Sequence, residues 1–254
     1  MNPALLVHLS GPLQSWGARS RFNSRDSERT PTRSGLIGLI ASVLGRSRET
    51  PLHGDALTQL RFIIRVDRPG TLLRDFHTVG GGLTRKNTVM TAEGKRRAAG
   101  ATTLTSQRYY VQDAAFTVAI IGEAETLSQC EQALRSPRWA PFLGRRSCPP
   151  TGPMVLGVHD EGLTALEAMP LARRHSAADG KTVSVEYFAD HHTVNATEPA
   201  HELQDDPVSF VSTDRRYLTR PVFRWHTTVS GDACAGYGLA FLTAMADHLG
   251  KESQ

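Results

Sequence analysis

The sequence predicts an α+β fold. Short apolar stretches with strand-like alternation are interleaved with stretches of helical periodicity. The 254 residues suffice for one large domain or for a domain with an appendage, and 39% hydrophobic with 21% charged residues is typical of a globular protein. The cysteines Cys130, Cys148 and Cys234 lack the paired spacing of a zinc site or a disulfide framework, so we expect buried reduced thiols.

The first elements follow from local patterns. Residues 4–9 predict a strand, because apolar side chains alternate until a Ser-Gly-Pro breaker. Thr32 or Ser34 can cap a helix that ends near Gly45, since apolar residues between them recur at helical spacing. Two strands are then expected around a Pro-Gly turn, at residues 60–67 and 72–79.

The middle of the chain predicts an arm and then a return to regular structure. Residues 80–105 are rich in Gly, Ala and Thr with few bulky apolar side chains, so we expect an arm that becomes ordered on a partner. The elements expected after it are a strand, a helix and a strand, at residues 110–121, 125–135 and 154–158.

This order of elements is typical of a ferredoxin-like or RRM-like domain with an insertion. We expect that domain at residues 1–160, with a thumb arm at about 78–108, and a smaller C-terminal α+β appendage at 161–254 that docks proteins. In the appendage we expect three strands and one helix, at residues 182–188, 208–211, 222–229 and 238–249.

Charge is distributed unevenly along the chain. Residues 1–150 carry 21 basic and 11 acidic groups, whereas residues 151–254 carry 8 and 14. The first part therefore suits a polyanionic partner. Residues 186–214 hold seven acidic residues and no Lys or Arg, so we expect this segment to face solvent or a protein partner and not a phosphate backbone.

Arginines and aromatic residues recur in the loop that follows the first strand. The arginines are Arg19, Arg21, Arg25, Arg29 and Arg33, with only two acidic residues among them. Guanidinium groups bind phosphates in bidentate fashion, while Trp16 and Phe22 offer flat surfaces for unstacked bases. The loop therefore suits single-stranded RNA, although its arginines could instead pair with Asp26 and Glu28 on a solvated surface.

Three sequence blocks resemble the CasD family of CRISPR Cascade subunits. They are LSGPLQSWG at residues 9–17 with Arg25 after it, PTRSGLIGL at residues 31–39, and PFLGRRSCPP at residues 141–150. The resemblance extends over roughly residues 4 to 160. It implies an RRM-like fold of the repeat-associated RNA-binding (RAMP) superfamily with an inserted thumb, in a non-catalytic subunit that grips the 5′ handle of the guide RNA (crRNA).

The resemblance also implies partners and contact residues. The expected partners are the crRNA handle, the backbone subunit CasC, the large subunit CasA and, through the assembled complex, target DNA. The expected RNA-binding residues lie in the N-terminal loop, the thumb and its base, and the Gly144 turn: Gln14, Ser15, Trp16, Arg19, Arg21, Phe22, Arg25, Arg33, Ser34, His77, Arg85, Lys86, Arg96, Arg97, Arg108, Tyr109, Arg145 and Arg146.

Two other functions stay open at this point. A related CRISPR protein is itself a metal-independent endoribonuclease that cuts the repeat, and for such a role His77 and Tyr109 would be the first candidates. A general RNA-binding protein outside CRISPR is the other alternative. We expect no catalytic residue, and we take His8, on an apolar strand, as a core residue.

We expect no bound cofactor, no metal and no membrane. The triplet Asp190-His191-His192 suits a metal site poorly, because neighbouring strand residues point to opposite faces. The Gly80-Gly81-Gly82 run lacks the Lys-Ser/Thr of a P-loop. No apolar run is long enough to cross a bilayer and the N-terminus lacks a signal-peptide pattern, so a cytoplasmic protein is expected.

Overall fold

The fold was analysed in a computed structural model. The structure describes residues 2–18, 24–52, 54–80, 94–96, 103–175 and 181–252. Within these ranges, no helix is long and apolar enough to cross a membrane.

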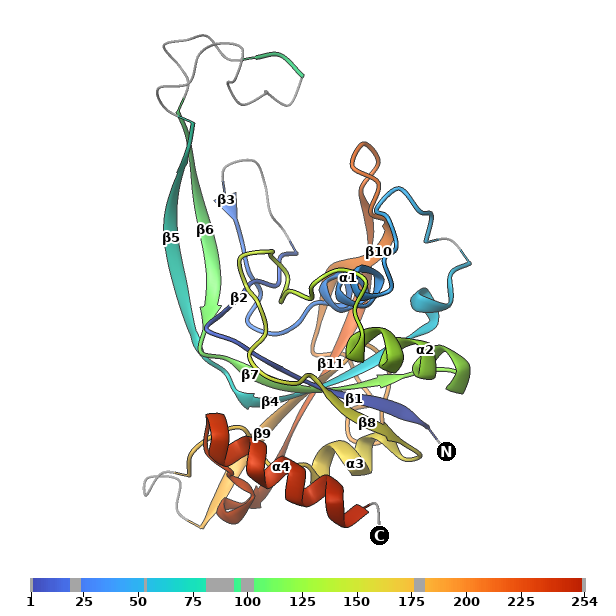
Figure 1. Ribbon diagram of the computed structural model, residues 1–254, viewed down its shortest axis with the longest axis vertical. Coiled ribbons are helices and arrows are strands. Elements are labelled where there is room, and N and C mark those ends of the chain that lie inside the picture. Colours follow the sequence, from blue (N-terminus) through green and yellow to red (C-terminus); the bar gives the residue numbers. More distant parts are fainter. Residues whose placement is uncertain are drawn as a thin grey trace.

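A curled antiparallel sheet forms the centre of the molecule (Figure 1), with the strand order β10-β11-β9-β4-β7-β1-β8. Its strands in chain order are β1 (Ala4–Ser10), β4 (Arg61–Arg68), β7 (Ala115–Ile121), β8 (Val155–His159), β9 (Thr182–Ala189), β10 (His201–Ser209) and β11 (Arg216–Ser230). The subset β8-β1-β7-β4 is connected through one helix after β1 and one after β7. The predicted alternation of strands and helices in the first part of the chain is therefore confirmed.

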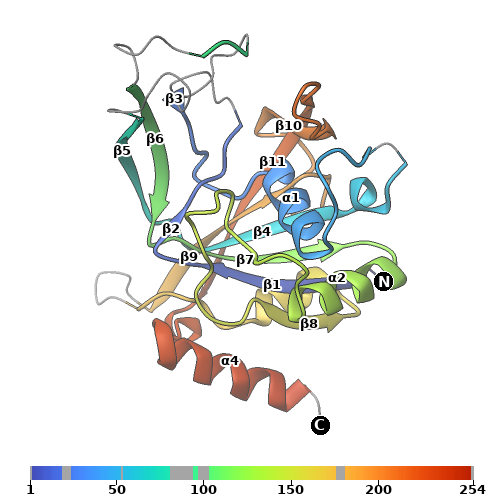
Figure 2. The same ribbon diagram turned by 45° about the horizontal axis from the view of Figure 1, so that its top comes forward.

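Helices cover both faces of this sheet (Figures 1 and 2). On one face, α1 (Arg33–Val43) and α2 (Ala124–Arg135) pack over the odd-numbered residues of β1 in the larger apolar core. On the other face, the smaller core includes residues from α3 (Gly162–Ala168) and α4 (Gly238–Glu252). Alternation along β1 thus supplies both cores, because successive strand side chains point to opposite faces. Short 3-10 helices lie at Ala56–Gln59 and Gly231–Ala233.

A second sheet builds the base of the predicted arm. β5 (Thr71–Val79) and β6 (Leu104–Gln112) form a long hairpin that rises from the main sheet (Figure 1), while β2 (Leu13–Gln14) and β3 (Ser24–Arg25) pair with β6. The single strand expected over residues 110–121 is instead two strands, β6 and β7. The chain turns between them at Asp113, whose φ of 54° is left-handed, a conformation that Asp tolerates better than most residues.

The expected separate C-terminal appendage is not set apart from the sheet. β9 pairs with β4, and β11 pairs with β9, so the C-terminal strands extend the same sheet. Side chains of β9 alternate between buried and exposed, as a strand covered on one face requires. The structure also adds α3, which spans only seven residues and was not predicted, and it extends the strands expected at residues 208–211 and 222–229 into the β10–β11 hairpin.

Candidate nucleic-acid interface

Residues 9–17 and 141–150, which are distant in sequence, pack against each other. Ser15 N–H donates to the Leu143 carbonyl at 3.0 Å, and Leu143 N–H donates to the Cys148 carbonyl at 2.7 Å. Gly144 has a φ of +84°, and a Cβ at that position would lie 1.7 Å from the Ser15 carbonyl oxygen. Only glycine fits both the dihedral and the space, so this turn is fixed against the N-terminal loop.

Arg145 ties this turn to two other segments. Its guanidinium donates to the backbone carbonyls of Tyr109 at 3.2 Å, Arg25 at 3.0 Å and Asp26 at 3.2 Å. It also lies 4.8 Å from the centre of the Tyr110 ring, within cation–π range. These contacts hold the turn, β3 and β6 together, and Arg145, which was predicted to bind RNA, also lines the cleft described below.

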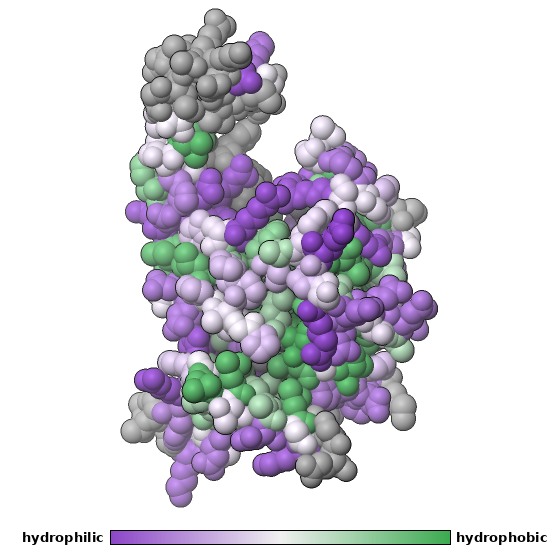
Figure 3. Space-filling view, viewed as in Figure 1, coloured by the Kyte–Doolittle hydropathy of each residue, from purple (hydrophilic) through white to green (hydrophobic). Residues whose placement is uncertain are grey.

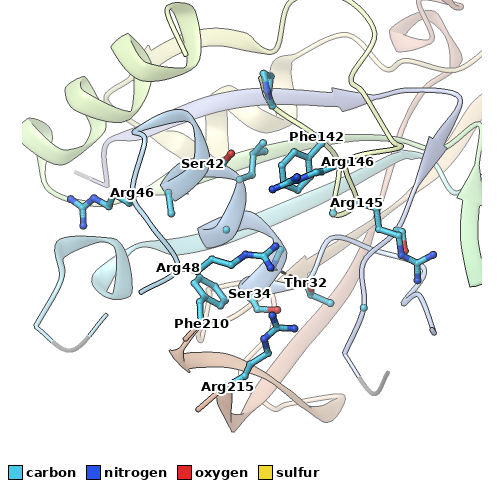
Figure 4. Close-up of a pocket in the computed structure, with 18 of the residues that line it drawn as sticks. Thr32, Ser34, Ser42, Arg46, Arg48, Phe142, Arg145, Arg146, Phe210 and Arg215 are labelled. Carbon is cyan, nitrogen blue, oxygen red and sulfur yellow. Dashed lines mark hydrogen bonds between the residues drawn. The ribbon is translucent and has the colours of Figure 1, made fainter. Parts of the chain in front are cut away.

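A large cleft of about 1070 Å³ opens above α1. Its walls are the N-terminal loop, one side of α1 along its length, the segments at residues 46–55 and 139–149, and the β10–β11 hairpin (Figure 4). Figure 3 shows hydrophilic side chains around the hollow between the β5–β6 arm and the rest of this face. Among the described residues, six arginines and one acidic residue line the cleft: Arg25, Arg46, Arg48, Arg145, Arg146, Arg215 and Asp55.

Within the described ranges, most of these arginines have no carboxylate partner. Arg46 pairs with Asp55. Four other arginines of the lining are exposed and have no carboxylate partner among the residues that the structure describes: Arg25, Arg48, Arg146 and Arg215. Guanidinium groups gathered without counter-charges attract an anion, and a row of them suits a phosphate backbone. The cleft also has four aromatic residues in its lining, Trp139, Phe142, Phe210 and Tyr217.

The predicted contacts at Gln14 and Trp16 need correction. Trp16 has no exposed surface and packs in the larger core, so its ring offers no face to a base. Its indole N–H donates to Gln14 Oε1 at 3.0 Å, and the Gln14 amide donates in turn to the carbonyls of Leu9 and Ala114. Ser15 is also buried as a residue and donates to the Tyr109 carbonyl, although it borders the cleft. These polar groups are satisfied within the protein.

Arg33 is a buried structural residue and not a surface contact. Its guanidinium donates to Asp190 Oδ2 at 2.5 Å, to Asp206 Oδ1 at 2.7 Å and to two backbone carbonyls. A charge is tolerated in such a place only when it is paired and hydrogen-bonded on every side. Ser34, the next residue, does line the cleft.

Most acidic residues of the segment at 186–214 pair with arginines of this chain. Asp205 is buried and accepts from Arg220 at 2.7 Å, and Glu186 accepts from Arg224 at 2.5 Å. Burial alone would raise the pKa of Asp190, but the His191 hydrogen bond and the Arg33 charge hold it below its ordinary value. The expectation that these acids face solvent or a partner is therefore wrong for Asp190 and Asp205, because they neutralise nearby arginines.

The predicted residues at the base of the thumb lie on the β5–β6 hairpin, outside the lining of the cleft. His77 pairs in register with Ser106, and Arg74 with Tyr109. Since strand residues alternate between faces, His77 and Arg108 share one face and Tyr109 lies on the other. The His77 Nε2 atom is 2.5 Å from Asp75 Oδ2.

Several expected contacts belong to segments that the structure does not describe. Arg19, Arg21, Phe22, Arg85, Lys86 and Arg97 lie outside the described residues, as does most of the predicted arm. Arg96 is described, but it does not line the cleft. Arg25 and Arg146, which were also predicted to bind RNA, are both exposed and line the cleft.

Sequence reasoning missed part of the lining. The missed residues lie after α1, before the Gly144 turn and on the β10–β11 hairpin: Arg46, Arg48, Trp139, Phe142, Phe210, Arg215 and Tyr217. The pair Arg215-Arg216 between two aromatic residues was a usable signal. It was outweighed by the acidic composition of the segment before it.

The residues that we considered as metal ligands, and the cysteines, have structural surroundings. Within the described ranges, no three His, Cys, Asp or Glu side chains are grouped to hold a metal ion. Asp190 pairs with Arg33, and the His192 ring packs edge-on against Phe223. Cys130 and Cys148 are buried free thiols, as predicted, whereas Cys234 is only half-buried.

Comparison with known proteins gives consistent matches over almost the whole chain. The family model described as "CRISPR-associated protein (Cas_Cas5)" matches residues 4–223. The chain is 33% identical to "CRISPR system Cascade subunit CasD" of Escherichia coli (strain K12) over 243 residues, which is 91% of this chain and 98% of that protein.

Solved structures agree with this match. A chain of a structure titled "CRISPR RNA-guided surveillance complex" superposes with a TM-score of 0.83 and 39% identity, covering 97% of this chain and 99% of that chain. A second, titled "Crystal structure of Cas protein", gives a TM-score of 0.60 and 29% identity, covering 92% and 98%. The chain therefore belongs to the Cas5 family of CRISPR-associated proteins.

Proposed function

We propose that this chain is the non-catalytic subunit of a cytoplasmic Cascade-type complex that holds the 5′ handle of the crRNA in the cleft above α1. The observation that carries the proposal is the set of four exposed arginines without carboxylate partners among the described residues that line this cleft: Arg25, Arg48, Arg146 and Arg215. The relative named as a Cascade subunit supports the choice of complex.

The lining of the cleft suits single-stranded RNA. Guanidinium groups bind phosphates along the backbone, while exposed aromatic rings stack on unpaired bases. Trp139 is 47% exposed in the lining and is suited to that stacking role. Phe142 and Arg146, both labelled in Figure 4, belong to the same segment of the lining.

The fold supports the rest of the proposal. The order β8-β1-β7-β4 is that of a ferredoxin-like unit, and the β5–β6 hairpin is the base of its thumb. We propose that the thumb and the C-terminal region contact CasC and CasA, and that target DNA is reached through the assembled complex. The outer strand β5 has exposed apolar side chains, with Phe76 65% exposed, which suits a protein or RNA partner.

The geometry of the hairpin disfavours the endoribonuclease alternative. Cleavage without metal needs an acid and a base on either side of one 2′-hydroxyl. His77 and Tyr109, the candidates for these roles, point to opposite faces of the β5–β6 hairpin. They are therefore poorly placed to act on the same ribose.

The test incubates the full-length protein with a labelled single-stranded RNA copied from the repeat of the same CRISPR locus, in EDTA and over a salt series. We expect stoichiometric retention of intact RNA, with a log–log salt slope of roughly −2 to −3, as for three or four phosphates neutralised by the four arginines. RNA of the same length and shuffled sequence should bind less tightly. Equal binding of both RNAs would favour a general RNA-binding protein, and multiple-turnover cleavage would favour a nuclease.

A further inference from the structure

The tip of the β10–β11 hairpin forms one wall of the cleft. Phe210 and Arg215 lie at the tip, Tyr217 follows on β11, and all three line the cleft. Figure 4 shows Arg48, from the segment after α1, on the same side as Phe210 and Arg215. Two arginines from distant parts of the chain therefore meet at this wall.

The electrostatics of Tyr217 agree with this placement of the two arginines. Burial raises the pKa of Tyr217, and the charges of Arg215 and Arg48 oppose that rise. Neither guanidinium is paired with a carboxylate in the described part of the chain, whereas the adjacent Arg216 pairs with Asp214 at 3.0 Å. Arg48 and Arg215 thus remain available to an external anion.

Hydrogen bonds connect the β10–β11 hairpin to the rest of the protein at its base and at its tip. At its base, Asp205 accepts from Arg220 at 2.7 and 2.9 Å and from the Arg33 backbone N–H at 2.6 Å. At its tip, the Ser212 hydroxyl donates to Glu49 Oε1 at 3.4 Å, next to Arg48. The tip therefore contacts the segment that follows α1.

We propose that the hairpin tip is a second RNA-binding wall, in which Arg48 and Arg215 together hold a backbone phosphate opposite the wall that contains Arg25 and Arg146. This inference rests on the proposed function and assigns part of that function to the C-terminal region. Phe210 and Tyr217 provide an apolar surface beside the phosphate, where a nucleotide can pack.

The experiment compares Arg215→Ala and Arg48→Ala with the matched control Arg216→Ala, which removes a neighbouring charge outside the cleft lining. The full-length variants are titrated with the labelled repeat RNA over a salt series. We expect each cleft variant to bind roughly tenfold more weakly, as for one charged hydrogen-bonded contact, while the control binds like the wild type. The two cleft variants together should flatten the log–log salt slope by about 0.7, because they share one phosphate.

The outcomes separate this inference from the proposed function. If Arg25→Ala and Arg146→Ala weaken binding while Arg48→Ala and Arg215→Ala do not, the hairpin tip does not bind RNA and the proposed function stands. If the wild-type protein does not retain the RNA at all, both fail. Thermal melting of each variant confirms its fold, and ultraviolet cross-linking of the wild-type complex should join RNA to a peptide that contains Phe210 or Tyr217. The absence of such a cross-link together with unchanged affinity would overturn the inference.

Discussion

The backbone N–H of Arg33 donates a 2.6 Å hydrogen bond to Oδ2 of Asp205, a residue 172 positions further along the chain. The same Asp205 binds the Arg220 guanidinium, while the Arg33 side chain reaches Asp190 and Asp206. This network joins the first turn of α1 to the base of the β10–β11 hairpin. Two walls of the cleft are therefore held together by buried charges.

Replacing Arg33 should destabilise the whole protein. In Arg33→Met, Asp190 would lose its cationic partner while staying buried, and breaking such a pair costs about 3–5 kcal/mol. Urea denaturation should show this loss in the free energy of unfolding. Arg25→Met, at an exposed position, should change it by less than about 0.5 kcal/mol. A similar small loss in both variants would mean that the Arg33 network contributes little to stability.

Local patterns predicted the elements well but not the burial of individual residues. Thr32 caps α1 through its own hydroxyl, which accepts from Gly35 N–H, so its role is visible in the sequence around it. Arg33 and Arg25 belong to the same arginine-rich loop in the sequence. Arg33 is nevertheless buried and paired with acidic residues of the C-terminal part, whereas Arg25 is exposed. That difference depends on β9 and β10, whose position no local pattern reveals.

The same reasoning explains the errors at the cleft. Trp16 was assigned to RNA because it stands in an arginine-rich loop, but its ring fills the core next to α1, and a Cβ on Gly35 would lie 2.7 Å from it. The hairpin was assigned away from RNA because its segment is acidic. Asp206 pairs with Arg33, Asp205 with Arg220 and Asp214 with Arg216. Within the described residues, none of these three acids is left to neutralise Arg215.

Substituting Gly144 should lower the free energy of unfolding by more than the strain of its positive φ alone would. In Gly144→Ala the new Cβ would collide with the Ser15 backbone, which cannot move without disturbing the N-terminal loop. Gly152 provides the matched control, since its φ is +79° but the nearest atom to a Cβ is 3.9 Å away. We expect about 1–2 kcal/mol of lost stability for Gly152→Ala and a clearly larger loss for Gly144→Ala in urea denaturation. Equal losses would show that the turn is not held against Ser15.

Reversing charge at the N-terminal wall should weaken RNA binding without unfolding the protein. Arg25 and Arg146 are exposed, so Arg25→Glu with Arg146→Glu should leave the melting temperature nearly unchanged. Affinity for the repeat RNA should fall by roughly a hundredfold, as expected for two lost charged contacts. Arg135→Glu on α2, where Arg135 pairs with Glu131 away from the cleft, serves as the control. Unchanged affinity in the double variant would remove this wall from the site.

His8 should make the stability of the protein sensitive to mild acid. It is buried on β1, as predicted for a core residue, with Nδ1 3.4 Å from the Thr117 hydroxyl and its ring 4.6 Å from that of Phe241 on α4. Burial lowers the pKa of His8 from 6.5 to about 4, against the opposing charge of Asp67.

The protonation of His8 sets the direction in which stability changes with pH. The folded pKa lies below the unfolded value, so between about pH 6.5 and pH 4 the unfolded chain binds more protons, and stability falls as the pH decreases through that window. From pH 7 to pH 5 the loss due to His8 should be about 2 kcal/mol in the free energy of unfolding. His8→Gln, which does not titrate, should lose that much less than the wild type over the same range in urea denaturation. If both proteins respond equally to pH, His8 is protonated in the folded state as easily as in the unfolded chain, and α4 is not packed over it as the structure indicates.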